Sequence, residues 1–262
     1  MHLKRLVVAT VLLPVLYLFI MLLSPAYFIF LLIGMSVIAL SEFYGMCQVK
    51  GIVRYAGIFF GIAILGTFYV SRELLLHVII LSVMALAAMR LLSKRDPRSS
   101  LYETSIPVFG LLYIPGLLTF QSYIRETGPE WIILLYATVW AADSVAYYIG
   151  TFLGKKKLYV EVSPNKTVAG AVGSLIGGIL GVIIMKYTLL PVLTVFSVFV
   201  IGIMIGTVSV VGDLVESMFK RDAGVKDSGI ILPGHGGILD KLDGVLFAGP
   251  VLFWFLIAIK IE

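Results

Sequence analysis

Long hydrophobic stretches recur along almost the whole chain, and they constrain its fold more than any other feature. A helix needs about 20 apolar residues to cross the hydrocarbon core of a bilayer, and runs of that length alternate here with short polar segments. Of the 262 residues 60% are hydrophobic and 13% are charged, whereas about a quarter of the residues in a soluble domain are charged. No stretch shows the alternation of a membrane β-barrel strand, and backbone groups in lipid must be satisfied within a helix. We therefore expect an all-α polytopic membrane protein.

The spacing of the hydrophobic stretches predicts nine transmembrane helices. The predicted spans are 5–23, 26–44, 55–71, 74–92, 106–124, 131–152, 168–187, 190–215 and 245–260. The first apolar run is longer than the core of a typical secretory signal, and further spans follow it. We interpret it as a retained transmembrane helix.

The distribution of Lys and Arg tests the number and direction of these spans. With the N-terminus inside, 16 basic residues fall on the inner side and 4 on the outer side. The inner segments are 1–5, 45–54, 90–105, 153–167 and 216–244, and the outer basic residues are Arg72, Arg125, Lys186 and Lys260. Because basic residues are enriched in cytoplasmic loops, we expect a cytoplasmic N-terminus and a C-terminus on the outer side. The expected location is the cell (inner) membrane.

The chain changes character near residue 130. Residues 1–130 hold five plain apolar helices, which we interpret as a scaffold, whereas residues 131–262 hold four helices with polar cytoplasmic loops and are expected to be catalytic. Small residues recur every four positions in the sixth and seventh spans, at Ala146, Gly150 and Gly154 and at Gly173, Gly177 and Gly181. This spacing predicts close helix packing within the membrane.

Carboxylates inside membrane helices are costly and usually face a polar cavity. Asp143 lies within the sixth span, with Tyr147 one turn later on the same face. It is a candidate site residue, although a structural hydrogen bond to a neighbouring helix would also explain it. Glu42, near the inner end of the second span, fits a site residue and an interfacial side chain equally well. The single cysteine, Cys47, excludes an intrachain disulfide.

The loop after the sixth span places turn residues, hydroxyls and a cation directly before a glycine-rich helix. Ser163, Lys166 and Thr167 are candidate phosphate-binding residues there, because helix N-termini and nearby hydroxyls bind phosphate well. No Walker A pattern precedes Thr167. The lysines at 155–157 are typical of a membrane-surface anchor.

The segment around the end of the eighth span carries the strongest signal for chemistry. Asp213, Glu216, Ser217 and Lys220 form one polar stripe at i, i+3, i+4 and i+7 of a helix. Carboxylates suit a hard cation such as Mg²⁺, and Lys or Arg side chains neutralise phosphate oxygens. Carboxylates and cations without a strong nucleophile favour phosphoryl or nucleotidyl transfer. The downstream candidates are Arg221, Lys226, His235, Gly236, Gly237, Asp240 and Asp243.

This segment resembles the signature of the phosphatidate cytidylyltransferase (CDP-diacylglycerol synthase) family. The matching residues are Ser217, Lys220-Arg221, Lys226-Asp227, the Pro-Gly-His-Gly-Gly run 233–237, Asp240-Lys241 and Asp243. Segments 143–147 and 163–167 also resemble family elements, and the first 130 residues match only in hydropathy and in Glu42. Lys241 stands where the signature usually has arginine, so the charge is kept but the bidentate fork is lost.

The resemblance implies the reaction of CTP with phosphatidate to give CDP-diacylglycerol and pyrophosphate, with Mg²⁺ and possibly K⁺. It implies Asp213, Asp240, Lys220, Lys226 and Asp143 as catalytic residues. The implied metal ligands are Asp213 and Asp240, with Asp243 and Asp143 behind them, and the phosphate contacts are Ser163, Lys166, Thr167, Ser217, Arg221, His235, Gly236 and Gly237. It also implies a homodimer in the lipid bilayer, with no nucleic acid as partner.

Two alternatives remain from the sequence. A CTP-dependent polyprenol or phytol kinase would share the membrane setting, although the full Pro-Gly-His-Gly-Gly motif argues against it. A cation-coupled transporter could use Asp143, Asp213 and Glu216 as an ion path but would not need the basic motif. A CDP-alcohol phosphotransferase is rejected, because only the opening of its motif matches at Asp240 and Asp243.

Overall fold

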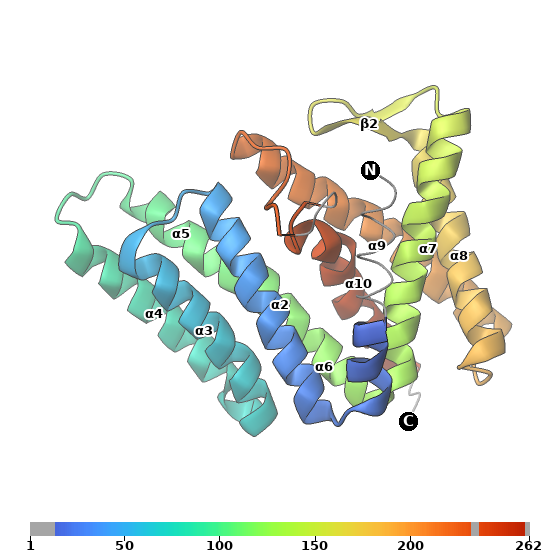
Figure 1. The fold of residues 1–262 in the computed structure, drawn as a ribbon, viewed down its shortest axis with the longest axis horizontal. Coiled ribbons are helices and arrows are strands. Elements are labelled where there is room, and N and C mark those ends of the chain that lie inside the picture. Colours follow the sequence, from blue (N-terminus) through green and yellow to red (C-terminus); the bar gives the residue numbers. More distant parts are fainter. Residues whose placement is uncertain (1–13, 232–235, 260–262) are drawn as a thin grey trace. The chain divides into compact units, whose positions relative to one another are not determined.

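The computed structural model describes residues 14–231 and 236–259, which form helices and one short β-hairpin (Figure 1). The main helices are α2 (Pro25–Met46), α3 (Gly51–Val70), α4 (Leu75–Ser93), α5 (Ser100–Leu111), α6 (Leu117–Thr127), α7 (Pro129–Leu153), α8 (Val168–Thr188), α9 (Val195–Asp222) and α10 (Leu239–Ala258). Short elements are the π-helical turns η1 (Leu18–Leu22) and η3 (Leu112–Gly116), the 3₁₀ turn η2 (Arg72–Leu74) and the strands β1 (Lys157–Tyr159) and β2 (Ser163–Thr167).

Eight helices in the described part of the chain are long and apolar enough to cross a membrane. This confirms the all-α polytopic fold class. The predicted first span, 5–23, lies mostly outside the described residues. The total of nine spans and the orientation of both termini therefore stay predictions.

The helix ends differ from the predicted spans where polar residues continue a helix beyond the apolar run. Helix α9 extends to Asp222, so the stripe from Asp213 to Lys220 is helical as predicted. Thr194 caps its N-terminus by accepting a hydrogen bond from the Ser197 N–H. The fifth predicted span is a compound of α5, η3 and α6, and the π-helical turn coincides with Pro115, which has no N–H to donate.

Contacts divide the chain into two compact units: Met1–Ser122 with Asp227–Asp240, and Tyr123–Lys226 with Lys241–Glu262. In the first unit, Tyr44 at the end of α2 is fully buried and its hydroxyl donates to the Pro107 carbonyl at 2.8 Å. Its ring fills space left open by Gly57 and Gly110, where a Cβ would collide with it. This packing fixes the C-terminal end of α2. The predicted division into a scaffold, residues 1–130, and a catalytic part, residues 131–262, stays a prediction.

In the second unit, α7, α8 and α9 pack through small residues. A Cβ at Gly177 would lie 2.8 Å from the Ala142 Cα of α7, and one at Gly206 would lie 3.0 Å from the Leu175 Cα of α8. Gly173 and Gly181 likewise lie against α7. The close packing predicted from the spacing of small residues is confirmed.

Gly178→Val should destabilise the packing of α8 against α9, because the valine side chain would collide with the Gly202 carbonyl of α9. A backbone group cannot move aside as the end of a flexible side chain can. We expect a cost of about 3 kcal/mol or more, measured as a lower thermal unfolding midpoint in detergent. Gly34→Val on α2 is the matched control, since among the described residues no atom outside its own stretch of helix would lie within 4 Å of a Cβ at this position. Equal midpoints for the two variants would contradict the packing.

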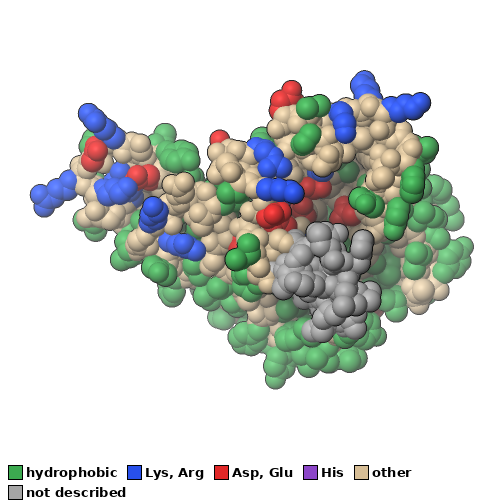
Figure 2. All heavy atoms as spheres, turned by 45° about the horizontal axis from the view of Figure 1, so that its top comes forward, with side chains coloured by type: hydrophobic (Ala, Val, Ile, Leu, Met, Phe, Trp, Pro, Cys, Tyr) green, Lys and Arg blue, Asp and Glu red, His purple; other side chains and the backbone are tan. Residues whose placement is uncertain are grey.

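Figure 2 shows one face of the molecule, with groups of Lys and Arg side chains on it and hydrophobic side chains along its margins. On α8 the exposed side chains Val172, Ile176, Leu180 and Ile184 recur every four residues and form one stripe. An exposed apolar stripe of this length suits lipid rather than water. With the apolar helices, it supports a multi-pass membrane protein.

Candidate active site

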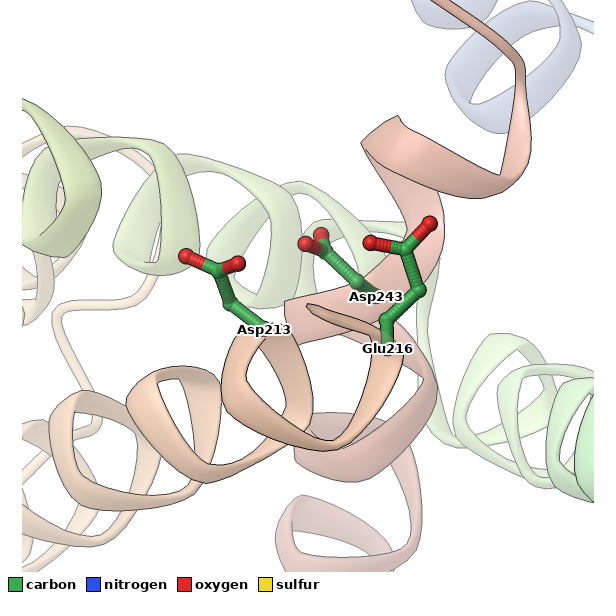
Figure 3. Close-up of side chains that lie close together, drawn as sticks. All are labelled: Asp213, Glu216 and Asp243. Carbon is green, nitrogen blue, oxygen red and sulfur yellow. The ribbon is translucent and has the colours of Figure 1, made fainter. Parts of the chain in front are cut away.

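Three carboxylates of the second unit converge: Asp213 and Glu216 from α9 and Asp243 from α10 (Figure 3). One oxygen from each lies within 4.8 Å of the others, and Glu216 is fully buried. Asp213 and Glu216 share a face of α9 because they are three residues apart. Gly212 allows α10 to approach, since a Cβ there would lie 3.1 Å from the Asp243 carbonyl carbon. We call these three residues the carboxylate cluster.

Two lysines offset the charge of the carboxylate cluster. Lys166 of β2 forms an ion pair with Asp213 at 2.6 Å, and Lys220 pairs with Glu216 one turn earlier on α9. The Ser217 hydroxyl donates to Asp213 at 3.3 Å. With every group counted as ionised, the three carboxylates and two ammonium groups carry a formal charge of −1. Such a site attracts a cation and can also hold phosphate oxygens near the lysines.

The β-hairpin explains how Lys166 reaches the cluster. Strands β1 and β2 are antiparallel, with Lys157 opposite Thr167 and Tyr159 opposite Ser163. The Thr167 hydroxyl caps α8 by accepting from the Gly170 N–H at 3.1 Å. Thr167 therefore has a structural use besides its predicted phosphate contact, and Ser163 is half-buried at the start of β2.

Arg221 ties the end of α9 to neighbouring backbone. Its Nε donates to the Val162 carbonyl at 3.2 Å and its Nη1 to the Val225 carbonyl at 2.9 Å. Lys226, in the segment after α9, is exposed. The phosphate contact predicted for Arg221 and the catalytic role predicted for Lys226 stay predictions, and these two carbonyls already accept hydrogen bonds from Arg221.

Asp143 is exposed on α7, close enough to Asp213 and Lys166 for their charges to act on it. Its charge also acts on Asp243. Tyr147, one turn later, is 68% exposed. The structure thus brings Asp143 into the electrostatic field of the carboxylate cluster.

Asp240, predicted to bind metal, belongs to the first unit and is engaged by its own loop. Its Oδ2 accepts from the Ser228 N–H at 3.0 Å, the Ser228 hydroxyl at 2.8 Å and the Gly237 N–H at 2.7 Å. Gly236 has a left-handed φ of +87°, which favours glycine. His235 lies outside the described residues, so its predicted phosphate contact stays a prediction. A metal role for Asp240 stays a prediction.

Two carboxylates, Glu216 and Glu42, have roles in the structure that the sequence does not predict. No ligand role is predicted for Glu216 from the sequence, although its place in the polar stripe beside Asp213 is a signal that identifies it. The sequence fits Glu42 equally well as a site residue or an interfacial one, and the structure buries it at 7% exposure. An interfacial side chain reaching for water is therefore ruled out for Glu42.

A model of the cytidylyltransferase family matches residues 3–259, nearly the whole chain. The chain belongs to the cytidylyltransferase family. It is 35% identical over 231 residues to the phosphatidate cytidylyltransferase of Staphylococcus haemolyticus, covering 85% of this chain and 87% of that protein. It is 32% identical over 266 residues to the phosphatidate cytidylyltransferase of Bacillus subtilis, covering 97% of both chains. This member of the cytidylyltransferase family is thus similar to those two enzymes along almost its full length.

Proposed function

We propose that the protein is a phosphatidate cytidylyltransferase, which converts CTP and phosphatidate to CDP-diacylglycerol and pyrophosphate. The observation that carries the proposal is the carboxylate cluster with its two lysines, set in membrane helices of a cytidylyltransferase family member. The apolar helices suit a diacyl lipid substrate, and the polar cluster suits a nucleoside triphosphate.

The carboxylate cluster fits a divalent cation. Its donors are hard oxygens, and the two lysines leave it one negative charge, so a cation is favoured there. We propose Asp213, Glu216 and Asp243 as the residues that hold Mg²⁺, with Asp143 near them and K⁺ as a further ion. When bound, the ion neutralises charge on the triphosphate and on the leaving pyrophosphate.

The reaction needs two anionic phosphates to approach each other. A phosphatidate oxygen attacks the α-phosphorus of CTP, the bond from that phosphorus to the bridging oxygen breaks, and pyrophosphate leaves with the electron pair. We propose that Lys166 and Lys220 reduce the repulsion between the phosphates, with Lys226 and Ser217 as further contacts. Positioning and charge neutralisation supply most of the catalysis in such transfers.

The setting of the enzyme follows from its substrates. CTP is cytoplasmic, and the segments that carry Lys166 and Lys220 fall on the side rich in basic residues. We propose an active site that faces the cytoplasm from the inner membrane, in a homodimer as the family resemblance implies.

Purified protein in detergent with phosphatidate should incorporate the α-phosphorus of labelled CTP into lipid. Incorporation should fall to background when EDTA removes divalent ions, and Mg²⁺ should restore it, because the cluster alone leaves the phosphate charges uncompensated. Thin-layer chromatography of the lipid extract measures the product. Labelling that persists in EDTA would contradict the ion site, and the absence of labelled lipid with Mg²⁺ present would contradict the function.

A further inference from the structure

Glu42 of α2 is a buried carboxylate that the proposed chemistry does not use. Its Oε1 accepts from the Ile238 N–H at 3.0 Å, and its Oε2 accepts from the Leu239 N–H at 2.9 Å and the Ser228 hydroxyl at 3.3 Å. All of these residues belong to the first unit. The segment they anchor is the described part of the loop, residues 228–231 and 236–239, and we call it the anchored loop.

The hydrogen bonds explain why a charge is tolerated in this buried position. The first amides of a helix have no partner within it, and Leu239 is the first residue of α10. A carboxylate that accepts from such amides also interacts favourably with the positive end of the helix. A buried carboxylate is costly unless it is hydrogen-bonded, and both oxygens of Glu42 are.

The anchored loop is shaped around this carboxylate. A Cβ at Gly229 would lie 2.5 Å from the Glu42 Oε1, and one at Gly237 would collide with the same carboxylate and with the Ser228 hydroxyl. Ser228 joins two acids, because its hydroxyl donates to both Glu42 and Asp240. Glycine at 229 and 237 is therefore needed for close approach to Glu42.

The end of α2 that carries Glu42 is itself held firmly. The neighbouring Phe43 is buried against Phe109 and Tyr113, with ring centroids 6.1 Å apart in each pair, and Tyr44 donates to the Pro107 carbonyl. Glu42 accepts a hydrogen bond from the amide of Leu239, the first residue of α10. The same helix carries Asp243 one turn later.

We propose that Glu42 is a positioning residue, which holds the anchored loop and the start of α10 in the conformation that cytidylyl transfer requires. This inference rests on the proposed function for its effect on turnover, but not for its effect on the loop. Both carboxylate oxygens of Glu42 accept hydrogen bonds from the anchored loop or the first residue of α10, so we assign its effect to these segments.

The test uses the full-length protein with Glu42→Leu and Glu42→Gln. Leucine keeps the volume but accepts no hydrogen bond, and glutamine keeps one acceptor oxygen. Since bonds to a charged group are strong, we expect kcat to fall at least about tenfold for leucine, and less for glutamine. The thermal midpoint should fall in both variants, because the Ile238 and Leu239 amides lose a charged acceptor, so kcat is measured well below the midpoint of each variant.

Hydrogen exchange without substrate reads the loop directly. In both variants the amides of Gly237, Ile238 and Leu239 should exchange faster than in the wild type, while the amides of α3 should not change. Ser36→Ala is the matched control, since Ser36 is fully buried on the same helix and makes no hydrogen bond among the described residues. It should leave both turnover and loop exchange unchanged.

Each result separates the possibilities. Wild-type kcat in Glu42→Leu, or unchanged loop exchange in either variant, would overturn the proposal, and so would loss of turnover only in proportion to loss of stability. If Glu42→Leu does not fold, Glu42→Gln decides by the same readouts. A wild-type protein that makes no CDP-diacylglycerol would refute the proposed function alone, because the exchange experiment needs no turnover.

Discussion

Asp243→Asn should lose at least about 100-fold in cytidylyl transfer, yet unfold at a higher temperature than the wild type when divalent ions are absent. Asparagine keeps the oxygen that accepts from the Gly244 N–H, at 2.8 Å in the structure, so the local backbone is preserved. It removes one of three carboxylates whose oxygens lie within 4.8 Å of one another. Since like charges at such distances repel, the folded protein should gain about 1 kcal/mol.

Label incorporation from CTP and thermal unfolding in detergent with EDTA measure the two effects. Asp222→Asn is the matched control, because Asp222 is an exposed carboxylate at the end of α9. It should change neither quantity. If Asp243→Asn turns over like the wild type, Asp243 is not part of the ion site. If Asp243→Asn unfolds at a lower temperature than the wild type, repulsion among the three carboxylates does not destabilise the fold.

Lys220→Met should lower both stability and turnover. Lys220 is buried at 8% exposure and pairs with Glu216, which is fully buried. Removing one partner of a buried ion pair costs about 3 kcal/mol or more, because the remaining charge stays away from water. Turnover should fall as well, since the cation proposed to face the triphosphate is gone.

The double variant Glu216→Gln/Lys220→Met separates these effects. A neutral glutamine needs no counter-charge, so the thermal midpoint should recover most of its loss while label incorporation stays low. Lys155→Met, at an exposed lysine near the hairpin, is the control and should resemble the wild type. Recovery of turnover together with stability would mean that the Glu216–Lys220 pair serves only the fold.

The membrane helices could be predicted from the sequence because hydrophobic length and the period of small residues are local properties. The stripe from Asp213 to Lys220 was predictable for the same reason, since helical spacing alone places these side chains on one face. The hairpin is missing from the predicted elements although Leu158, Val160 and Val162 alternate with more polar residues as in a strand, because the alternation spans only about six residues. Its strands depend on pairing with each other and on the cap that Thr167 provides for α8.

The division of labour among the acidic residues could not be read from the sequence. Asp240 and Asp243 are three residues apart and equally polar, yet Asp240 accepts three hydrogen bonds within its loop while Asp243 joins the carboxylate cluster. The partners of Glu42 lie almost 200 positions along the chain, at Ser228, Ile238 and Leu239. Such pairings arise from tertiary contacts, which no local pattern encodes.

In the proposed reaction an oxygen of phosphatidate links its phosphorus to the α-phosphorus of CTP. Parallel reactions of the purified protein with α-labelled and γ-labelled CTP, in the presence of phosphatidate and Mg²⁺, show which phosphorus reaches the lipid. The α-label should enter the lipid fraction, and the γ-label should leave as pyrophosphate. Transfer of the γ-label to lipid would instead reveal a lipid kinase and rule out cytidylyl transfer.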